Sequence, residues 1–246
     1  MRNAFKRYAA GTAAALAFAA LPAHAAPILN GGFEDGFANW TRADQVGSEG
    51  TFTLQSGTTS PVTGMDVPAP PEGANAAMTD AEGGGSHVLY QDFMQATPVT
   101  SARLSFDLFV GNRAEAFFIP ATPTLDWATA VLNQQARVDI LAGGSDPFSM
   151  ATADLLLNLF ATELGDPLVS GYNHFEIDIT ELLNANLNQT LRLRFSEVDN
   201  VNMFQFGVDN VALEFGDPTD VPEPASALLL LAGLAAGALS RRRTRT

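Results

Sequence analysis

The sequence predicts an all-β chain that folds as an antiparallel β-sandwich, and two observations support this fold class. Apolar residues recur at every second position through the middle of the chain, which is typical of strands with one buried face. The stretches between them are rich in Gly, Pro, Asn and Asp, the residue types that tight turns require. Because the chain shows few long helical patterns, no internal repeat and no second core, we expect one domain.

The alternation is clearest in three segments. Apolar side chains occupy every second position in residues 104–110, and the same pattern returns in residues 175–179 and 191–195. The polar and charged residues between them predict that the other face of each strand lies in water. Shorter candidate strands are residues 52–54, 88–93 and 138–141.

Two segments fit the strand pattern poorly. Residues 154–162 suit either a short helix or a buried strand, because their apolar residues follow neither period cleanly. Residues 56–85 are dominated by small residues, Pro and Gly, and we expect a long loop over the sandwich there.

The last predicted strand changes phase. Apolar residues alternate up to Val208 and resume at Val211, so the inward-facing set shifts by one position. Such a shift requires a bulge, which we place at Asp209 and Asn210. A carboxylate at a bulge near the edge of a sandwich is well placed to hold a cation.

Composition excludes several classes of function. The 246 residues carry a formal net charge of −14 and no cysteine, so a disulfide scaffold, a thiolate zinc site and a cysteine nucleophile are ruled out. The basic residues gather at the two ends, which leaves six arginines and no lysine in between. Such an acidic body repels phosphate groups, so nucleic acid is not an expected partner, and divalent cations are a better electrostatic match.

The first 25 residues have the order of a secretory signal peptide. Basic residues precede an apolar run at 9–21, and the small-residue pattern Ala23-His24-Ala25 follows. We expect signal peptidase to cleave after Ala25. An alanine-rich buried helix is the alternative, but it does not explain the basic flank and the cleavage pattern together.

The final segment, residues 221–246, combines a proline-rich motif, an uncharged apolar run at 225–239 and an arginine cluster. The motif is Val221, Pro222, Glu223 and Pro224, and the cluster includes Arg241, Arg242 and Arg243. A spanning helix needs roughly 20 apolar residues, so this short hydrophobic helix is a weak anchor and we expect only a transient stay in the inner membrane. The arginines would keep its end on the cytoplasmic side.

This order of motif, short helix and arginines resembles the PEP-CTERM sorting signal of Gram-negative bacteria. The resemblance implies processing by an exosortase, a membrane enzyme that removes the tail, and delivery to the cell surface or the extracellular matrix. A plain C-terminal membrane anchor is the competing interpretation.

Five short motifs are spread over the body of the chain. They are Asn30-Gly31-Gly32-Phe33-Glu34, Gly36-Phe37-Ala38-Asn39-Trp40, Asp178-Ile179-Thr180, Leu191-Arg192-Leu193-Arg194-Phe195 and Gly207-Val208-Asp209-Asn210-Val211. Together they resemble the galactose-binding-domain-like jelly roll of many carbohydrate-binding modules. The resemblance implies a jelly roll at residues 26–220 and a structural Ca²⁺ on Glu34 and Asp209, with backbone carbonyls completing the oxygen ligands that this ion prefers. The alternative is that both acids are solvated turn residues.

Candidate ligand contacts are aromatic. Sugar binding calls for an exposed aromatic side chain beside amides or carboxylates, and Trp127, Tyr90 and Tyr172 are the candidates. We expect Trp40 in the core, whereas Trp127 lies in an insertion-like segment, residues 111–135.

These observations rank three functions. The first is a noncatalytic surface or matrix protein that binds an extracellular polysaccharide through a Ca²⁺-stabilised jelly roll. The second is a purely structural protein of a biofilm or floc matrix. An extracellular hydrolase comes last, because the sequence has no G-x-S-x-G elbow, H-E-x-x-H helix, EF-hand loop or phosphate loop.

Overall fold

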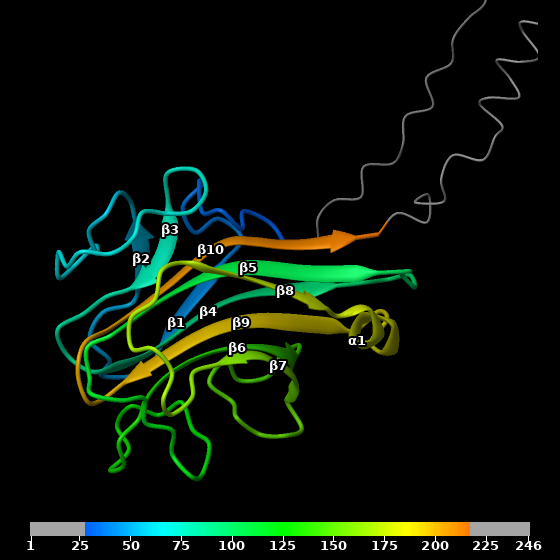
Figure 1. The fold of residues 1–246 in the computed structure, drawn as a ribbon. Coiled ribbons are helices and arrows are strands. Elements are labelled where there is room, and N and C mark those ends of the chain that lie inside the picture. Colours follow the sequence, from blue (N-terminus) through cyan, green and yellow to red (C-terminus); the bar gives the residue numbers. More distant parts are fainter. Residues whose placement is uncertain (1–27, 217–246) are drawn as a thin grey trace, which may run out of the picture.

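The computed structural model describes residues 28–216, which form a sandwich of two five-stranded antiparallel sheets (Figure 1). This confirms the predicted fold class. The predicted signal peptide and sorting segment lie outside the described residues. Among the residues that the structure describes, no helix has the length and hydrophobicity of a membrane span.

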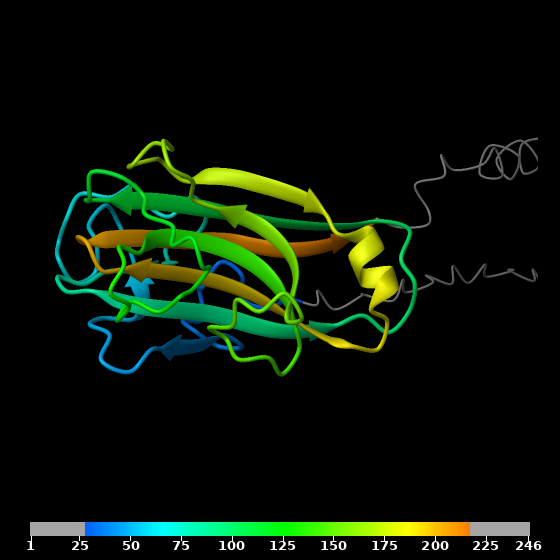
Figure 2. The same ribbon diagram turned by 90° about the horizontal axis from the view of Figure 1, so that it is seen from below.

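Consecutive strands often alternate between the two sheets, as in a jelly roll. The first sheet has the order β1 (Thr41–Asp44), β4 (Gly85–Met94), β9 (Thr190–Asp199), β6 (Gln134–Ala142) and β7 (Leu155–Ala161). The second has the order β2 (Phe52–Gln55), β3 (Ala76–Thr79), β10 (Phe204–Phe215), β5 (Ala102–Asn112) and β8 (Asn173–Asp178). Helix α1 (Thr180–Ala185) leads from β8 towards β9 across one end of the sandwich (Figure 2).

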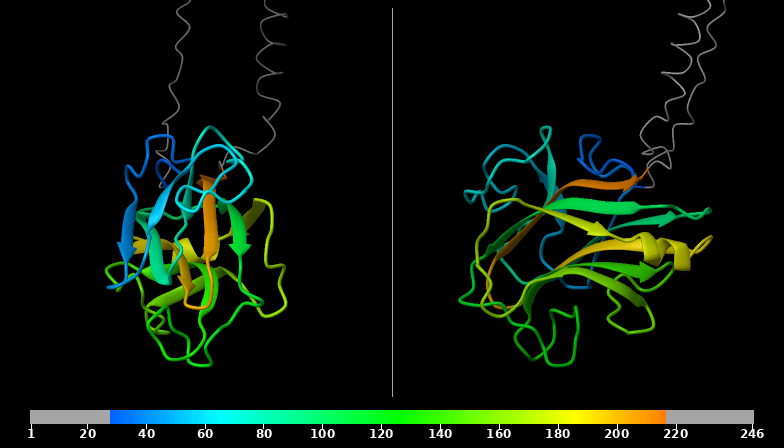
Figure 3. Two further views of the ribbon diagram at one scale, coloured as in Figure 1. Left: turned by 90° about the vertical axis from the view of Figure 1, so that its left-hand side faces the viewer. Right: turned by 45° about the vertical axis from the view of Figure 1, so that its right-hand side comes forward.

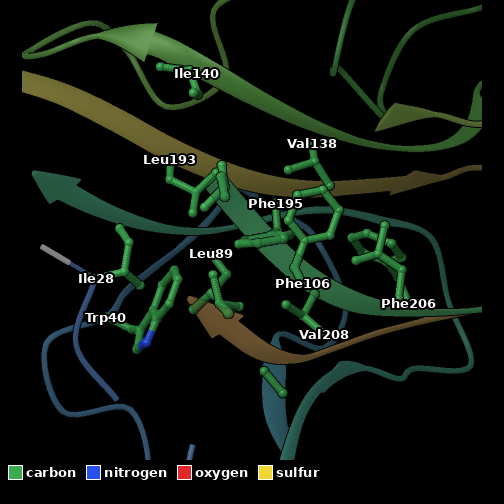
Figure 4. Packing of buried hydrophobic residues seen from close by; sticks show 14 of the residues in the cluster. Ile28, Trp40, Leu89, Phe106, Val138, Ile140, Leu193, Phe195, Phe206 and Val208 are labelled. Carbon is green, nitrogen blue, oxygen red and sulfur yellow. The ribbon is translucent and has the colours of Figure 1, made fainter. Parts of the chain in front are cut away.

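The two sheets lie one against the other (Figure 3). The core fills the space between them with alternate residues from both (Figure 4). Phe106 of β5 meets Phe195 of β9 edge to face, with ring centroids 5.6 Å apart. Trp40 is buried, as predicted, and its indole N–H donates to the carbonyl oxygen of Asn30 at 2.9 Å. Burying each large apolar side chain contributes about 1.5–3 kcal/mol, so the alternating pattern is what specifies the fold.

The outer face of β9 is covered, so the predicted wet face is wrong for this strand. Arg192 and Arg194 are 7% and 0% exposed beneath the segment 143–154. The guanidinium of Arg194 donates to the carbonyl oxygens of Pro147 and Ser149 and pairs with Asp139. The two arginines thus supply hydrogen-bond donors to backbone carbonyl groups of this segment, at positions where water is excluded. The exposed alternate residues of β8 match the prediction.

The long loop predicted at residues 56–85 is shorter than expected. Residues 56–75 do form a covering segment, in which Val67 packs on Met78 and Phe109 outside the second sheet. However, β3 and the start of β4 lie within the predicted loop. Strand β3 pairs with both β2 and β10, and these ladders override the weak strand propensity of its small residues.

The predicted bulge is confirmed. The pairing of β10 with β5 shifts register between Asp209 and Ala212, and Asn210 has a φ of 52°, a left-handed conformation that Asn tolerates. Beyond it, the N–H of Val211 donates to the carbonyl oxygen of Gly31 at 3.1 Å. The first and last segments of the domain thus meet, while the ambiguous residues 154–162 largely form strand β7.

Candidate functional site

A pocket of about 460 Å³ opens where β9 finishes. This end of the sandwich lies opposite α1 (Figure 1). Three segments line it: residues 82–84 before β4, residues 127–129 of the long connection between β5 and β6, and residues 199–202, which begin with the last residue of β9. Trp127, one of the predicted ligand contacts, is among the lining residues and is partly exposed.

Trp127 is held in place from several sides. Its backbone N–H donates to Oε1 of Gln45 at 3.2 Å, and its carbonyl oxygen accepts from Nδ2 of Asn200 at 3.0 Å. The indole packs against two glycines, since a Cβ at Gly47 would lie 3.2 Å from Cζ2 and one at Gly84 would lie 3.5 Å from Cε3. The ring is therefore a preorganised surface in the pocket wall.

The side chains of the two pocket asparagines are hydrogen-bonded to backbone groups of the fold. The Nδ2 of Asn200 also donates to the carbonyl oxygen of Val131, and its Oδ1 accepts from the N–H of Asn133. The Nδ2 of Asn202 donates to the carbonyl oxygen of Arg113 at 2.8 Å. The other lining residues with side-chain oxygens are Glu82, Thr129 and Asp199, of which Asp199 is almost completely buried.

Behind the pocket lies a buried acidic pair. Asp199 is 4% exposed, and its Oδ1 accepts a hydrogen bond from the N–H of Gly85 at 2.6 Å. Glu197 is 1% exposed, and its Oε1 has no hydrogen-bond partner within the described part of the chain. Burial raises the pKa of Asp199 to about 7, and burial together with the neighbouring Asp199 raises the pKa of Glu197.

Sequence reasoning missed this pair, although a signal for it existed. The alternation of residues 191–195 continues to positions 197 and 199, which places both carboxylates on the inward side of β9. His87 of β4 pairs with Glu197 across the strands, and its Nδ1 lies 2.7 Å from Oδ1 of Asp44. The histidine therefore already has a carboxylate partner of its own.

The other two predicted aromatic contacts lie apart from the pocket. The ring of Tyr90 on β4 is covered by the guanidinium of Arg192, whose Cζ lies 3.9 Å from the ring centroid. The hydroxyl of Tyr172 donates to Oε1 of Gln55 at 3.0 Å, and burial raises its pKa. The structure thus does not bring Trp127, Tyr90 and Tyr172 together.

The two predicted calcium ligands approach one loop. Oε1 of Glu34 accepts from the N–H groups of Ala74 and Asn75 at 2.8 and 2.9 Å, which lowers its pKa. Oδ2 of Asp209 accepts from the N–H of Glu72 at 3.3 Å, and burial raises the pKa of Asp209 to about 7. Within residues 28–216, no three acidic or histidine side chains are grouped as metal ligands. A Ca²⁺ site on Glu34 and Asp209 stays a prediction.

Comparisons with known proteins identify the C-terminal segment. Residues 220–243 match the family model described as the PEP-CTERM protein-sorting motif, which confirms the sorting signal predicted from the sequence. This motif indicates a chain that is exported and targeted to the cell surface. No curated protein matches the sequence.

Several solved structures resemble the sandwich at low identity. The carbohydrate-binding module TmCBM61, solved with beta-1,4-galactotriose, is 12% identical, with 78% of this chain and 100% of that chain covered and a TM-score of 0.44. A carbohydrate-binding module specific for non-crystalline cellulose is 16% identical, with 79% and 99% covered and a TM-score of 0.40. The Stig cyclase Fisc from Fischerella sp. TAU is 20% identical, with 78% and 96% covered and a TM-score of 0.42. At this level the similarities are no guide to ligand or activity.

Proposed function

We propose that this protein is a noncatalytic, exported glycan-binding protein whose ligand site is the Trp127 pocket. The observation that carries the proposal is the joint placement of Trp127, Glu82 and Asp199 around one opening. The apolar face of a sugar ring packs on an indole, and sugar hydroxyls donate to carboxylates. Gln45 and Asn200 fix Trp127 before a ligand binds. Little binding free energy is therefore lost in ordering the site.

The sorting motif supports glycan binding outside the cell. Processing by an exosortase near residues 221–224 would release the domain to the surface or extracellular matrix of a Gram-negative bacterium. There, glycan binding would attach the domain to the surrounding polymer. The acidic, lysine-free body suits such a medium better than a polyanionic partner.

A structural Ca²⁺ is a second part of this proposal. Asp209 is completely buried beside Asp107, its partner in the pairing of β5 and β10, and both are acidic. A cation near Asp209 would favour the ionised form of this buried carboxyl group. Glu34 approaches the same 72–75 loop, so both predicted ligands would support closure of the domain by its first and last segments.

A glycan array probed with the exported protein tests the binding function. We expect binding to at least one polysaccharide class, and a loss of about tenfold or more in affinity for Trp127→Ala. Tyr90→Ala is the matched control, since it removes an aromatic ring away from the pocket and should leave affinity unchanged. No binding to any glycan would favour a structural matrix role, and turnover on a polysaccharide panel would favour a hydrolase.

A further inference from the structure

We propose that the Trp127 pocket selects a glycan that carries free, protonated amino groups, such as an unacetylated hexosamine polymer, over neutral and acidic glycans. This inference rests on the proposed function, because it names the class of sugar that the same pocket takes. It comes from the charges around the pocket.

The wall of the pocket carries acidic side chains. Glu82 and Asp199 line it directly, and the carboxylate of Glu49 lies against Gly83, where a Cβ would collide with it. None of the lining residues, all within the described part of the chain, is basic. A uronic acid or a sulfated sugar would therefore meet repulsion with no compensating partner, whereas an ammonium group would be attracted.

The acidic pair of β9 can ionise when a cation binds in front of it, since burial holds both carboxyl groups towards their neutral form. Oε1 of Glu197 is buried without a hydrogen-bond partner among the described residues, beside the buried Asp199. His87, which pairs with Glu197 across the strands, has its Nδ1 in contact with Asp44. Ionising a buried carboxyl group is costly, and a cationic ligand in front of Asp199 would offset that cost by favouring the ionised form. A neutral sugar provides no such compensation.

The aromatic member of the site favours the same ligand. A cation over the face of an indole is attracted by its π electrons, and tryptophan is the best of the aromatic residues for this contact. An aromatic face beside two carboxylates therefore suits an ammonium group better than an N-acetyl group, which is uncharged and larger. The pocket volume of about 460 Å³ falls in the size range of small-ligand sites.

Calorimetric titration of the exported protein tests the inference with three oligosaccharides of equal length. These are a β-1,4-linked glucosamine oligomer, its fully N-acetylated counterpart, and an oligogalacturonate, each measured at about pH 6.5 with a chelator present. We expect the free amine to bind about tenfold or more tighter than the acetylated oligomer, and the acidic oligomer not to bind. Equal or tighter binding of the acetylated oligomer would overturn the selectivity while leaving glycan binding intact.

Two substitutions locate the selectivity. Glu82→Gln and Asp199→Asn keep the side-chain shape but cannot carry a negative charge. Each should therefore reduce the preference for the amine without reducing binding of the acetylated oligomer. Glu82 is exposed, so its variant keeps the test valid if the buried substitution impairs folding. Glu176→Gln, on the exposed face of β8, is the matched control and should change nothing. A preference that survives in both pocket variants would refute the proposed role of these carboxylates. Failure of the free amine to bind would overturn the selectivity, whereas only an absence of binding to any glycan on the array would reject the proposed function itself.

Discussion

The carbonyl oxygen of Trp127 accepts a hydrogen bond of 3.0 Å from Nδ2 of Asn200, a residue that itself lines the pocket. The same side chain binds Val131 at 2.9 Å and Asn133 at 2.7 Å, so it fastens the whole segment 127–133 to the end of β9. The position of the aromatic platform therefore depends on a residue whose own amide is occupied by the fold.

Asn200→Ala should lower both stability and glycan affinity. We expect a loss of about 1–3 kcal/mol in the free energy of unfolding, because several backbone groups lose their partner, and a weaker complex because Trp127 is no longer fixed. Denaturant unfolding and glycan titration measure the two effects. Asn184→Ala is the control: Asn184 makes two hydrogen bonds to Val99 near α1, so its loss should reduce stability alone. Unchanged affinity in Asn200→Ala would contradict the positioning role.

Arg194→Met should destabilise the protein far more than an equivalent change at the surface. Arg194 and Asp139 are both fully buried, so removal of the arginine leaves Asp139 with less compensation and two loop carbonyls without a donor. We expect a loss of about 3–5 kcal/mol in urea unfolding. Arg103→Met removes an exposed pair with Glu176 and should cost less than about 1 kcal/mol. Similar losses in the two variants would refute the role assigned to the buried pair.

The period of two predicted the strands well because it records which residues enter the core. Residues 104–110 and 191–195 lie in β5 and β9, and Trp40 is in the core. What lies on the outer faces was not predictable, because segments distant in sequence cover them. Arg192 and Arg194 read as solvated residues, yet each donates to carbonyl oxygens of the 143–154 segment.

The sequence singled out one residue of the candidate pocket but not its neighbours. Trp127 stood out as an aromatic residue in an insertion, but its neighbours Glu82 and Asp199 come from segments that only the fold brings together. Tyr90 was also a predicted ligand contact. However, Arg192 stacks on its ring, so the ring is not open to a ligand. The missing information is tertiary in both cases.

Gly31→Ala should weaken the closure of the domain. An ideal Cβ at Gly31 would overlap the carbonyl oxygen of Val211, which is backbone and cannot turn away as a side chain can. We expect a loss of about 1–3 kcal/mol or more and a lower Tm, because the first and last segments must separate. Gly171→Ala is the control, since nothing lies within 4 Å of its Cβ position, and its Tm should stay near that of the wild type. An unshifted Tm for Gly31→Ala would show that this contact is dispensable.

Stability should fall as pH rises from about 4 to about 7. Burial raises the pKa of both Asp199 and Asp209 to about 7, from an ordinary value of 3.8. Between these two values the folded state holds more protons than the unfolded state, so raising the pH favours unfolding until both groups are ionised. Asp139 acts in the opposite sense: burial would raise its pKa, but Arg137 and Arg194 lower it, so its contribution is lost only below about pH 4. Melting curves with a chelator should show the decline, and Asp199→Asn and Asp209→Asn should each flatten it.

Calcium should reverse this decline if Glu34 and Asp209 hold the ion. A cation beside Asp209 favours its ionised form, so added Ca²⁺ should raise Tm at about pH 7.5 and have little effect at about pH 5, where the folded protein keeps the carboxyl protonated. A concentration of 100 times Kd would add about 2.7 kcal/mol to the free energy of unfolding. Glu34→Gln and Asp209→Asn should each abolish the shift, whereas Asp199→Asn, at the other carboxylate with a raised pKa, should retain it. The calcium site would be refuted if the wild type showed no shift in Tm, or if the shift survived in Asp209→Asn. The two carboxylates would then stabilise the fold through their hydrogen bonds to the 72–75 loop and not through a metal ion.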